Sequence, residues 1–131
     1  MDGAEPSVLG QTVRGPVEQL DVIATDGVDL LREVSFHTDE LVSMCPITGQ
    51  PDLSSLTITY VPVDGRIIES KSLKLYLWGF RERGIFCEQI ASEVAGRVAT
   101  DTGADRVTVV VRQAVRGGIV TTATAAVGGG T

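Results

Sequence analysis

The chain has 131 residues, of which 43% are hydrophobic and 21% charged, and its formal net charge is −6 with a pI near 4.6. This length suits one domain with a single core, and aromatic residues are so few (5%) that Val, Ile, Leu and Ala must build that core. The negative charge argues against binding nucleic acid through its phosphates, although a free base or a small nucleoside is still allowed.

Nothing in the sequence indicates a membrane or secreted protein. No apolar run reaches the roughly 20 residues that a membrane-spanning helix needs. Residues 1–6 contain neither the basic segment nor the apolar segment of a signal peptide. We therefore expect a cytoplasmic protein.

Residues able to bind a metal are scarce. Two cysteines and one histidine do not make a convincing zinc site within one chain, so we expect no bound metal. A cytosol keeps thiols reduced, and a redox-labile disulfide between Cys45 and Cys87 is the open alternative.

The chain begins with an arm followed by two strands. Residues 1–16 are rich in glycine, proline and polar side chains and predict a flexible arm, after which 17–127 form the single domain. Alternating apolar side chains predict a strand within 28–38 and a clearer one over 56–62. A Val-Asp-Gly turn at 63–65 follows.

Two helices come next. Ser70 is expected to cap the first, whose apolar side chains lie on one stripe and which stops at Gly84. The second carries apolar side chains at intervals of four residues from Phe86 and ends near Gly103.

Two more strands complete the predicted domain. Residues 106–115 are dense in β-branched side chains, Gly117-Gly118 separates them from a hairpin partner over 119–126, and 128–131 form a flexible tail. The order strand-strand-helix-helix-strand-strand predicts an α+β fold whose antiparallel four-stranded sheet carries both helices on one face. Because so small a sheet leaves two open edges, we expect copies to join edge to edge into an oligomeric barrel.

The first unusual segment lies between the first two strands and reads Cys45-Pro-Ile-Thr-Gly-Gln-Pro-Asp52. Its prolines and glycine indicate a tight loop, with a thiol and a carboxylate seven positions apart. A thiol of lowered pKa is a nucleophile and a carboxylic acid can deliver a proton, so Cys45 and Asp52 are candidate catalytic residues. The alternative is a small buried Cys45 and a turn-forming Asp52.

Two further segments offer binding groups. Ile68-Glu-Ser-Lys-Ser-Leu-Lys74 places hydroxyls, free N–H groups and two cations at a helix start, which suits a phosphate. Phe86-Cys87-Glu88 opens the second helix, where a buried Glu88 can accept hydrogen bonds from a guanine-like edge. The alternatives are a capped amphipathic helix with solvated lysines and a glutamate that complements the helix dipole.

Together these segments resemble the NADPH-dependent 7-cyano-7-deazaguanine reductases (QueF) of the unimodular type, which make 7-aminomethyl-7-deazaguanine on the way to queuosine. The resemblance extends over residues 36–119. Its motifs are Phe36-x-Thr38-x-Glu40-Leu41, the loop from Cys45 to Asp52, Glu69-Ser-Lys-Ser-Leu-Lys74 and Arg116-Gly-Gly-Ile119.

The resemblance implies a tunnelling fold (T-fold), with copies assembled into pentamer-based rings (a decamer) and active sites between subunits. It implies that Cys45 attacks the nitrile carbon to form a thioimide and that Asp52 supplies the proton for the imide nitrogen. Two hydrides from two NADPH molecules would then give the amine, because a thioimide accepts hydride better than a nitrile does. The implied base-binding residues are Ile68, Glu69, Ser70, Cys87 and Glu88, and the implied NADPH-binding residues are Ser70, Lys71, Arg116 and Gly117.

The sequence departs from the family pattern at Cys87, where a histidine usually precedes the base-anchoring glutamate. A thiol is a weak donor and stays uncharged where a histidine would not. His37 is an alternative source of an imidazole. Two other functions stay open: a QueF-like enzyme that adds ammonia to the same thioimide without NADPH, and a non-catalytic deazapurine-binding relative.

Overall fold

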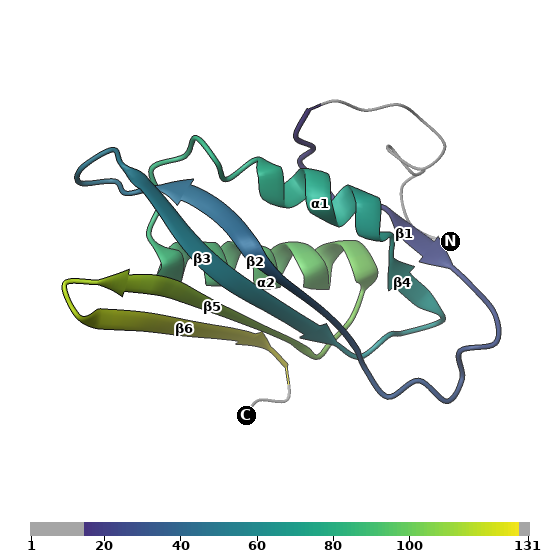
Figure 1. The fold of residues 1–131 in the computed structure, drawn as a ribbon. Coiled ribbons are helices and arrows are strands. Elements are labelled where there is room, and N and C mark those ends of the chain that lie inside the picture. Colours follow the sequence, from purple (N-terminus) through teal and green to yellow (C-terminus); the bar gives the residue numbers. More distant parts are fainter. Residues whose placement is uncertain (1–14, 129–131) are drawn as a thin grey trace.

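Figure 1 shows a computed structural model of the chain, which describes residues 15–128. The elements are β1 Val22–Ala24, β2 Val34–Met44, β3 Pro51–Tyr60, β4 Arg66–Ile68, α1 Ser70–Trp78, α2 Cys87–Thr102, β5 Val107–Arg116 and β6 Ile119–Val127. Apart from the short β1 and β4, this is the predicted order of strands and helices.

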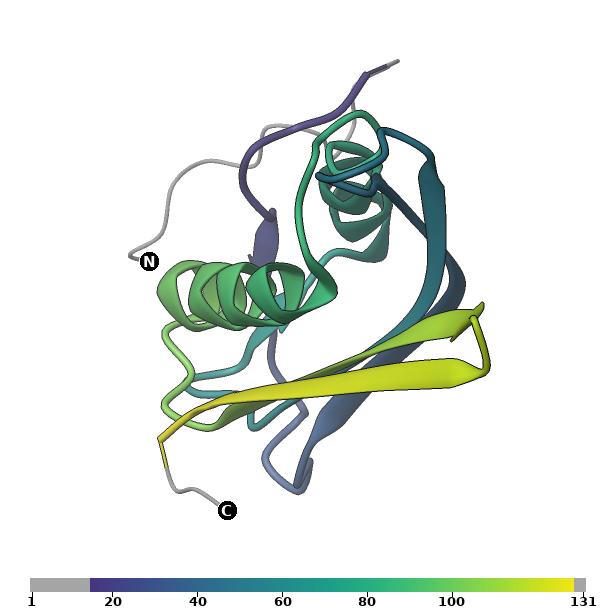
Figure 2. The same ribbon diagram turned by 90° about the vertical axis from the view of Figure 1, so that its left-hand side faces the viewer.

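The four long strands form one antiparallel sheet in the spatial order β2-β3-β5-β6, so β2 and β6 lie at its edges. Both helices cover the same face of this sheet (Figure 2), with α2 packed on β5 and β6 and α1 nearer to β2. The predicted fold class is therefore confirmed, whereas the joining of copies into a barrel remains a prediction.

Alternation along β3 and β5 separates an apolar face from a polar one. The almost fully buried side chains include Leu56, Ile58 and Tyr60 of β3, Val107, Val109 and Val111 of β5, and Ile90, Val94 and Val98 of α2. On the opposite face, the hydroxyls of Thr57 and Thr59 lie 2.8 Å from polar atoms of His37 and Ser35 on β2. The helices therefore supply the cover that the apolar face requires.

The strand predicted within 28–38 starts later and runs further. β2 begins at Val34, and a bulge between Thr38 and Leu41 shifts its register against β3. A bulge adds one residue to one strand and so reverses which side chains face inward. Phe36 faces inward before the bulge and Leu41 after it, which is why the alternation in the sequence stops there.

The first helix is shorter than predicted. It ends at Trp78, with Gly79 as its C-cap, and not at Gly84. The next N–H groups donate three residues back, as from Phe80 to the Leu77 carbonyl at 3.1 Å. Such tight turns end the α-helical hydrogen-bond pattern, whereas the apolar spacing in the sequence continues to Phe80.

A small antiparallel sheet of β1 and β4 is missing from the predicted elements, because three residues are too few for a period to show. This sheet holds the start of α1 in place. The backbone N–H of Asp21 donates to the Ser72 hydroxyl, and that of Glu69 donates to the Asp21 carbonyl, both at 2.9 Å.

Residues 1–14 of the predicted arm and 129–131 of the predicted tail lie outside the described residues, and the division into arm, domain and tail remains a prediction. Within residues 15–128, no helix is both long enough and apolar enough to cross a membrane.

Replacing Ile90 with alanine is expected to lower the free energy of unfolding by about 2–5 kcal/mol, because a cavity adds to the lost burial. Ile90 is fully buried on α2, whereas Ser92 on the same helix is exposed. Ser92→Ala should therefore change that free energy by less than about 0.5 kcal/mol. Urea unfolding followed by circular dichroism compares the two variants, and equal losses would contradict the placement of Ile90 in the core.

Candidate active site

The loop between β2 and β3 holds Cys45 in a fixed backbone position. The N–H of Cys45 donates to the Gln50 carbonyl, and its carbonyl accepts from the Gly49 N–H, both at 2.8 Å. Gly49 has a φ of 72°, a conformation that favours glycine and lets the chain reverse. The predicted tight loop is confirmed, and the thiol stands at its first residue.

The surroundings of Cys45 favour its thiolate. Its pKa is lowered to about 7, chiefly by a hydrogen bond from the Thr48 side chain and further by backbone hydrogen bonds from Thr48 and Ile47. The charge of Arg116 contributes more weakly in the same direction. The thiolate is the nucleophilic form, and Cys45 is only half-buried, so this setting favours a reactive thiol over an inert core residue.

Asp52 lies within β3 and not in a turn. Its side chain is 6% exposed and forms an ion pair with Arg116, the last residue of β5. Ser43, directly opposite Asp52 on β2, is also buried. Asp52, the candidate proton donor, is therefore buried at the end of the sheet next to the Cys45 loop, and its carboxylate contacts the Arg116 guanidinium.

A backbone contact ties the Cys45 loop to the segment before α2. The Met44 N–H donates to the Arg83 carbonyl at 2.9 Å, and the Ile85 N–H donates to the Met44 carbonyl at 3.1 Å. An added Cβ on Gly84 would lie 3.5 Å from the Pro46 Cα, so the two backbones approach closely. The start of α2 is thereby brought beside the nucleophile loop.

At the start of α2, Cys87 is buried and Glu88 is exposed. The Cys87 thiol donates to Glu88 Oε1 at 3.4 Å. Burial, and then the neighbouring Glu88, raise the pKa of Cys87 to about 11, so it stays a neutral thiol. Glu88 is not buried in the single chain, and its carboxylate is open to a ligand.

The other predicted site residues lie at the start of α1, at the other end of this helix from the turns that lead to α2 (Figure 1). The Ile68 N–H donates to the Tyr60 hydroxyl at 2.8 Å, which fixes the end of β4 on the core. Glu69, and not Ser70, is the N-cap of α1, because its carboxylate accepts from the backbone N–H groups of Lys71 and Ser72. This capping is a structural role that the sequence did not assign to Glu69.

The predicted residues therefore form two groups within one chain. The first, at the β2–β3 loop, the start of α2 and the β5–β6 turn, contains Cys45, Asp52, Cys87, Glu88, Arg116 and Gly117. The second, at the start of α1, contains Ile68, Glu69, Ser70 and Lys71. The nine residues of α1, roughly 13 Å of helix, stand between the second group and the turns that precede α2.

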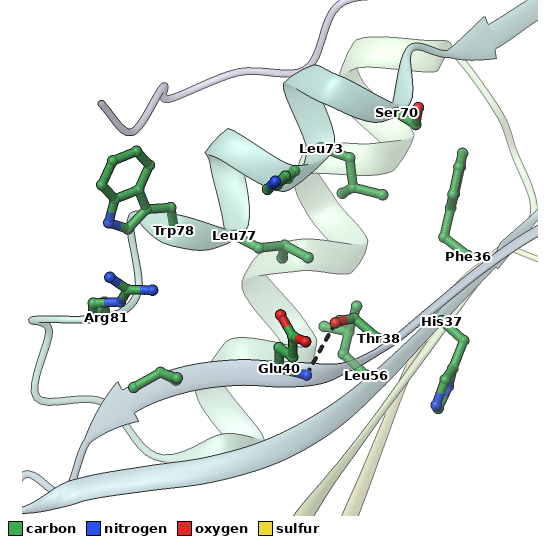
Figure 3. Close-up of a pocket in the computed structure, with 12 residues that line it drawn as sticks. Phe36, His37, Thr38, Glu40, Leu56, Ser70, Leu73, Leu77, Trp78 and Arg81 are labelled. Carbon is green, nitrogen blue, oxygen red and sulfur yellow. Dashed lines mark hydrogen bonds between the residues drawn. The ribbon is translucent and has the colours of Figure 1, made fainter. Parts of the chain in front are cut away.

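A cavity of about 550 Å³ lies between α1 and β2 (Figure 3). Its lining includes Phe36, Thr38 and Glu40 of β2, Ser70, Lys74 and Trp78 of α1, and Arg81 beyond the helix. Ser70 is the one predicted site residue in this lining. Lys74 belongs to the predicted signature. No pattern in the sequence indicated Trp78 or Arg81 as lining residues, because their positions next to the cavity depend on where α1 ends.

The cavity fits part of a dinucleotide cofactor. Lys74 and Arg81 bring positive charge that suits phosphates, and Phe36 and Trp78 offer flat apolar surfaces. Arg116 and Gly117 lie away from this lining, so one chain does not bring all four predicted NADPH-binding residues together.

Two further expectations concern imidazole and metal chemistry. His37 lies in the middle of β2, where its ring nitrogens are 2.8 Å from Thr57 Oγ1 and Asp39 Oδ1, and both of these partners lie outside the Cys45 loop. Among residues 15–128 there is no group of three or more His, Cys, Asp or Glu side chains placed to hold a metal.

Sequence comparisons find similar proteins over most of the chain. A family model described as "QueF-like protein" matches residues 51–129. The NADPH-dependent 7-cyano-7-deazaguanine reductases of Anaeromyxobacter sp. (strain Fw109-5) and Thermomicrobium roseum are each 37% identical over 110 residues, which cover 84% of this chain and 89% and 85% of theirs. The reductase of Syntrophus aciditrophicus is 38% identical over 113 residues, covering 86% of this chain and 79% of its own.

Among solved structures, a crystal structure of the archaeosine synthase QueF-Like in the apo form superimposes with a TM-score of 0.71. The match covers 77% of this chain and 98% of that chain at 24% sequence identity. At this identity the likeness concerns the fold, and it agrees with the predicted tunnelling fold.

Iodoacetamide is expected to alkylate Cys45 at a rate that rises through a midpoint near pH 7 and then levels off, because the thiolate is the reacting form. Cys87 should stay unmodified in the folded chain, since it is buried with a pKa of about 11. Peptide mass spectrometry across a pH series distinguishes the two thiols.

Thr48→Val removes the strongest hydrogen bond to the thiolate and should move the Cys45 midpoint upward, whereas Thr122→Val, on the exposed side of β6, should not. A Cys45 midpoint near the ordinary thiol value of 9.0 in the unaltered chain would contradict this account.

Proposed function

The chain belongs to the QueF-like protein family, and we propose that it is an NADPH-dependent reductase that converts the nitrile of 7-cyano-7-deazaguanine to the primary amine of 7-aminomethyl-7-deazaguanine. The predicted family and enzyme class are supported by relatives that carry this reductase name over 84–86% of the chain. The observation that carries the proposal is Cys45, a half-buried thiol with a pKa lowered to about 7 at the end of the strand that faces Asp52.

In the proposed reaction, the Cys45 thiolate attacks the nitrile carbon and forms a thioimide. A thiolate in a fixed loop suits this step, because attack then needs no reordering of the backbone. Asp52 delivers the proton that the new imide nitrogen requires. NADPH, when bound, supplies the hydrides, and the reduction from nitrile to amine needs two of them.

The base is proposed to lie against the start of α2. Glu88 is exposed in the first helical turn, so its two carboxylate oxygens can accept the paired N–H groups of a guanine-like edge. Cys87, buried beneath it, takes the position of the family's histidine. Ile68, Glu69 and Ser70 are proposed to line the base pocket, and Ser70 and Lys71, with Arg116 and Gly117, to hold NADPH.

We further propose that the complete site lies between subunits of a homo-oligomer, in pentamer-based rings. The separation of the predicted residues into two groups at different ends of α1 supports this assembly, because one copy contributes only one group to a given site. The open edges of β2 and β6 are the surfaces on which copies would join.

The proposed setting is the cytoplasm, in queuosine biosynthesis for tRNA modification. The protein is expected to act on the free base and not on nucleic acid, in keeping with its net charge of −6.

In an assay with 7-cyano-7-deazaguanine, the chain is expected to oxidise two NADPH per nitrile and to show a Cys45 adduct by intact mass when NADPH is left out. Cys45→Ala should abolish both signals. Asp52→Asn should slow adduct formation by about 100-fold or more, the usual contribution of a positioned proton donor. An adduct that yields an amidine with ammonia and consumes no NADPH would instead indicate the amidine-forming activity, and no adduct at all would indicate a non-catalytic base-binding protein.

Cys87→His is expected to raise kcat/KM for the nitrile by about tenfold, because an imidazole beside Glu88 can donate a stronger hydrogen bond and exchange a proton. Cys87→Ser is the matched control, since it keeps the small size and lacks the ring. Equal kcat/KM for all three proteins, with unchanged urea midpoints, would show that the position has no part in the reaction.

A further inference from the structure

In the described part of the chain, Arg116 forms an ion pair with a buried residue. Its guanidinium contacts Asp52 Oδ1, and the Asp52 side chain is 6% exposed while that of Arg116 is 43% exposed. A buried carboxylate without a nearby cation is strongly disfavoured in its ionised form. Arg116 supplies that cation to Asp52 while remaining accessible to solvent.

The backbone around Arg116 is built to hold the guanidinium at this place. Arg116 pairs with Ile119 across a tight hairpin turn, in which Gly117 and Gly118 have φ values of 59° and 82°. A register shift between Gln113 and Arg116 re-aims the last side chains of β5. The hairpin turn and the register shift together leave the Arg116 side chain directed toward Asp52 on β3.

Arg116 also acts on the nucleophile. Its charge is among the causes that lower the pKa of Cys45. One guanidinium therefore influences both proposed reacting groups of the chain, the thiol and the carboxylate.

We propose that Arg116 is a positioning residue for the attack on the nitrile, which holds Asp52 in its ionised form beside the Cys45 loop. This inference rests on the proposed function and extends it, because the family resemblance assigns Arg116 only to NADPH. An ion pair with a guanidinium favours the carboxylate over the carboxylic acid.

The proton balance follows from this starting state. The Cys45 thiol proton passes to the Asp52 carboxylate, the sulfur forms a bond to the nitrile carbon, and one π pair of the C≡N bond moves to nitrogen. Asp52 then returns the same proton to that nitrogen. The step consumes no external proton, oxidant or reductant, and Asp52 ends as the carboxylate that Arg116 holds.

The test measures the rate of Cys45 adduct formation from 7-cyano-7-deazaguanine without NADPH, in the full chain, by intact mass. Arg116→Gln is expected to slow the adduct by about 10- to 100-fold, a part of the usual contribution of acid–base catalysis. Arg116→Lys, which keeps the charge but not the planar fork, should recover part of the rate. Arg112→Gln, which alters an exposed arginine on the same strand, should react like the unaltered chain.

Placing Arg116→Gln in an Asp52→Asn background separates a role through Asp52 from an independent one. In that background, Arg116→Gln should slow adduct formation by no more than about two-fold, because only the direct effect of the Arg116 charge on the thiol is then lost. Adduct formation at the unaltered rate in Arg116→Gln, with only KM for NADPH raised, would overturn the proposal. An equally large loss in the Asp52→Asn background would overturn it as well.

Failure of the proposed function gives a different result. If the unaltered chain forms no nitrile adduct, the reductase proposal fails, and iodoacetamide still tests Arg116. At pH 7, Arg116→Gln should alkylate at Cys45 about two-fold more slowly than the unaltered chain, because the loss of the Arg116 charge lowers the thiolate fraction. Equal alkylation rates would overturn the role of Arg116. Urea midpoints confirm that each variant is folded.

Discussion

The buried carboxylate of Asp52 needs a compensating charge, and the end of the sheet is arranged around that need. Removing one member of a fully buried ion pair costs about 3–5 kcal/mol, and the loss here should be smaller because the Arg116 side chain is 43% exposed. Arg116 reaches Asp52 because β5 lies beside β3 and runs antiparallel to it until it arrives at the level of the carboxylate. The same pairing aligns Ile58 with Val109 in the core. One strand pairing therefore supports both the packing and the candidate chemistry.

The Cys45 loop depends on that frame from two sides. Hydrogen bonds within the loop fix the thiol, and the backbone contact of Met44 with residues 83–85 brings the first turn of α2 next to it. Glu88 thus becomes a neighbour of the nucleophile loop, although it follows Cys45 by 43 positions along the chain. The start of α1, capped by Glu69, lies elsewhere, and in the proposed assembly a second copy would supply it.

Much of this site could be predicted from local patterns. The prolines and glycine after Cys45 indicated the loop that the structure contains, and the β-branched run indicated β5. The sequence also indicated that Cys87 is buried, because it lies three residues before Ile90 on the apolar face of α2. The length of β2 could not be predicted, since its bulge reverses the alternation and only pairing with β3 fixes where the bulge falls. The N-cap could not be assigned either, because Glu69 and Ser70 are both chemically able to cap.

Local patterns were enough to predict the types and order of the long elements, the loop that carries Cys45, and the family to which the chain belongs, because periodicity, turn residues and motifs are local properties. Which side chains meet could be seen only in the folded chain. The fold paired Asp52 with Arg116, formed a cavity from Lys74, Trp78 and Arg81, and separated the predicted binding residues into two groups. Such contacts depend on strand register and on where a helix ends, and these follow from the packing of the whole chain.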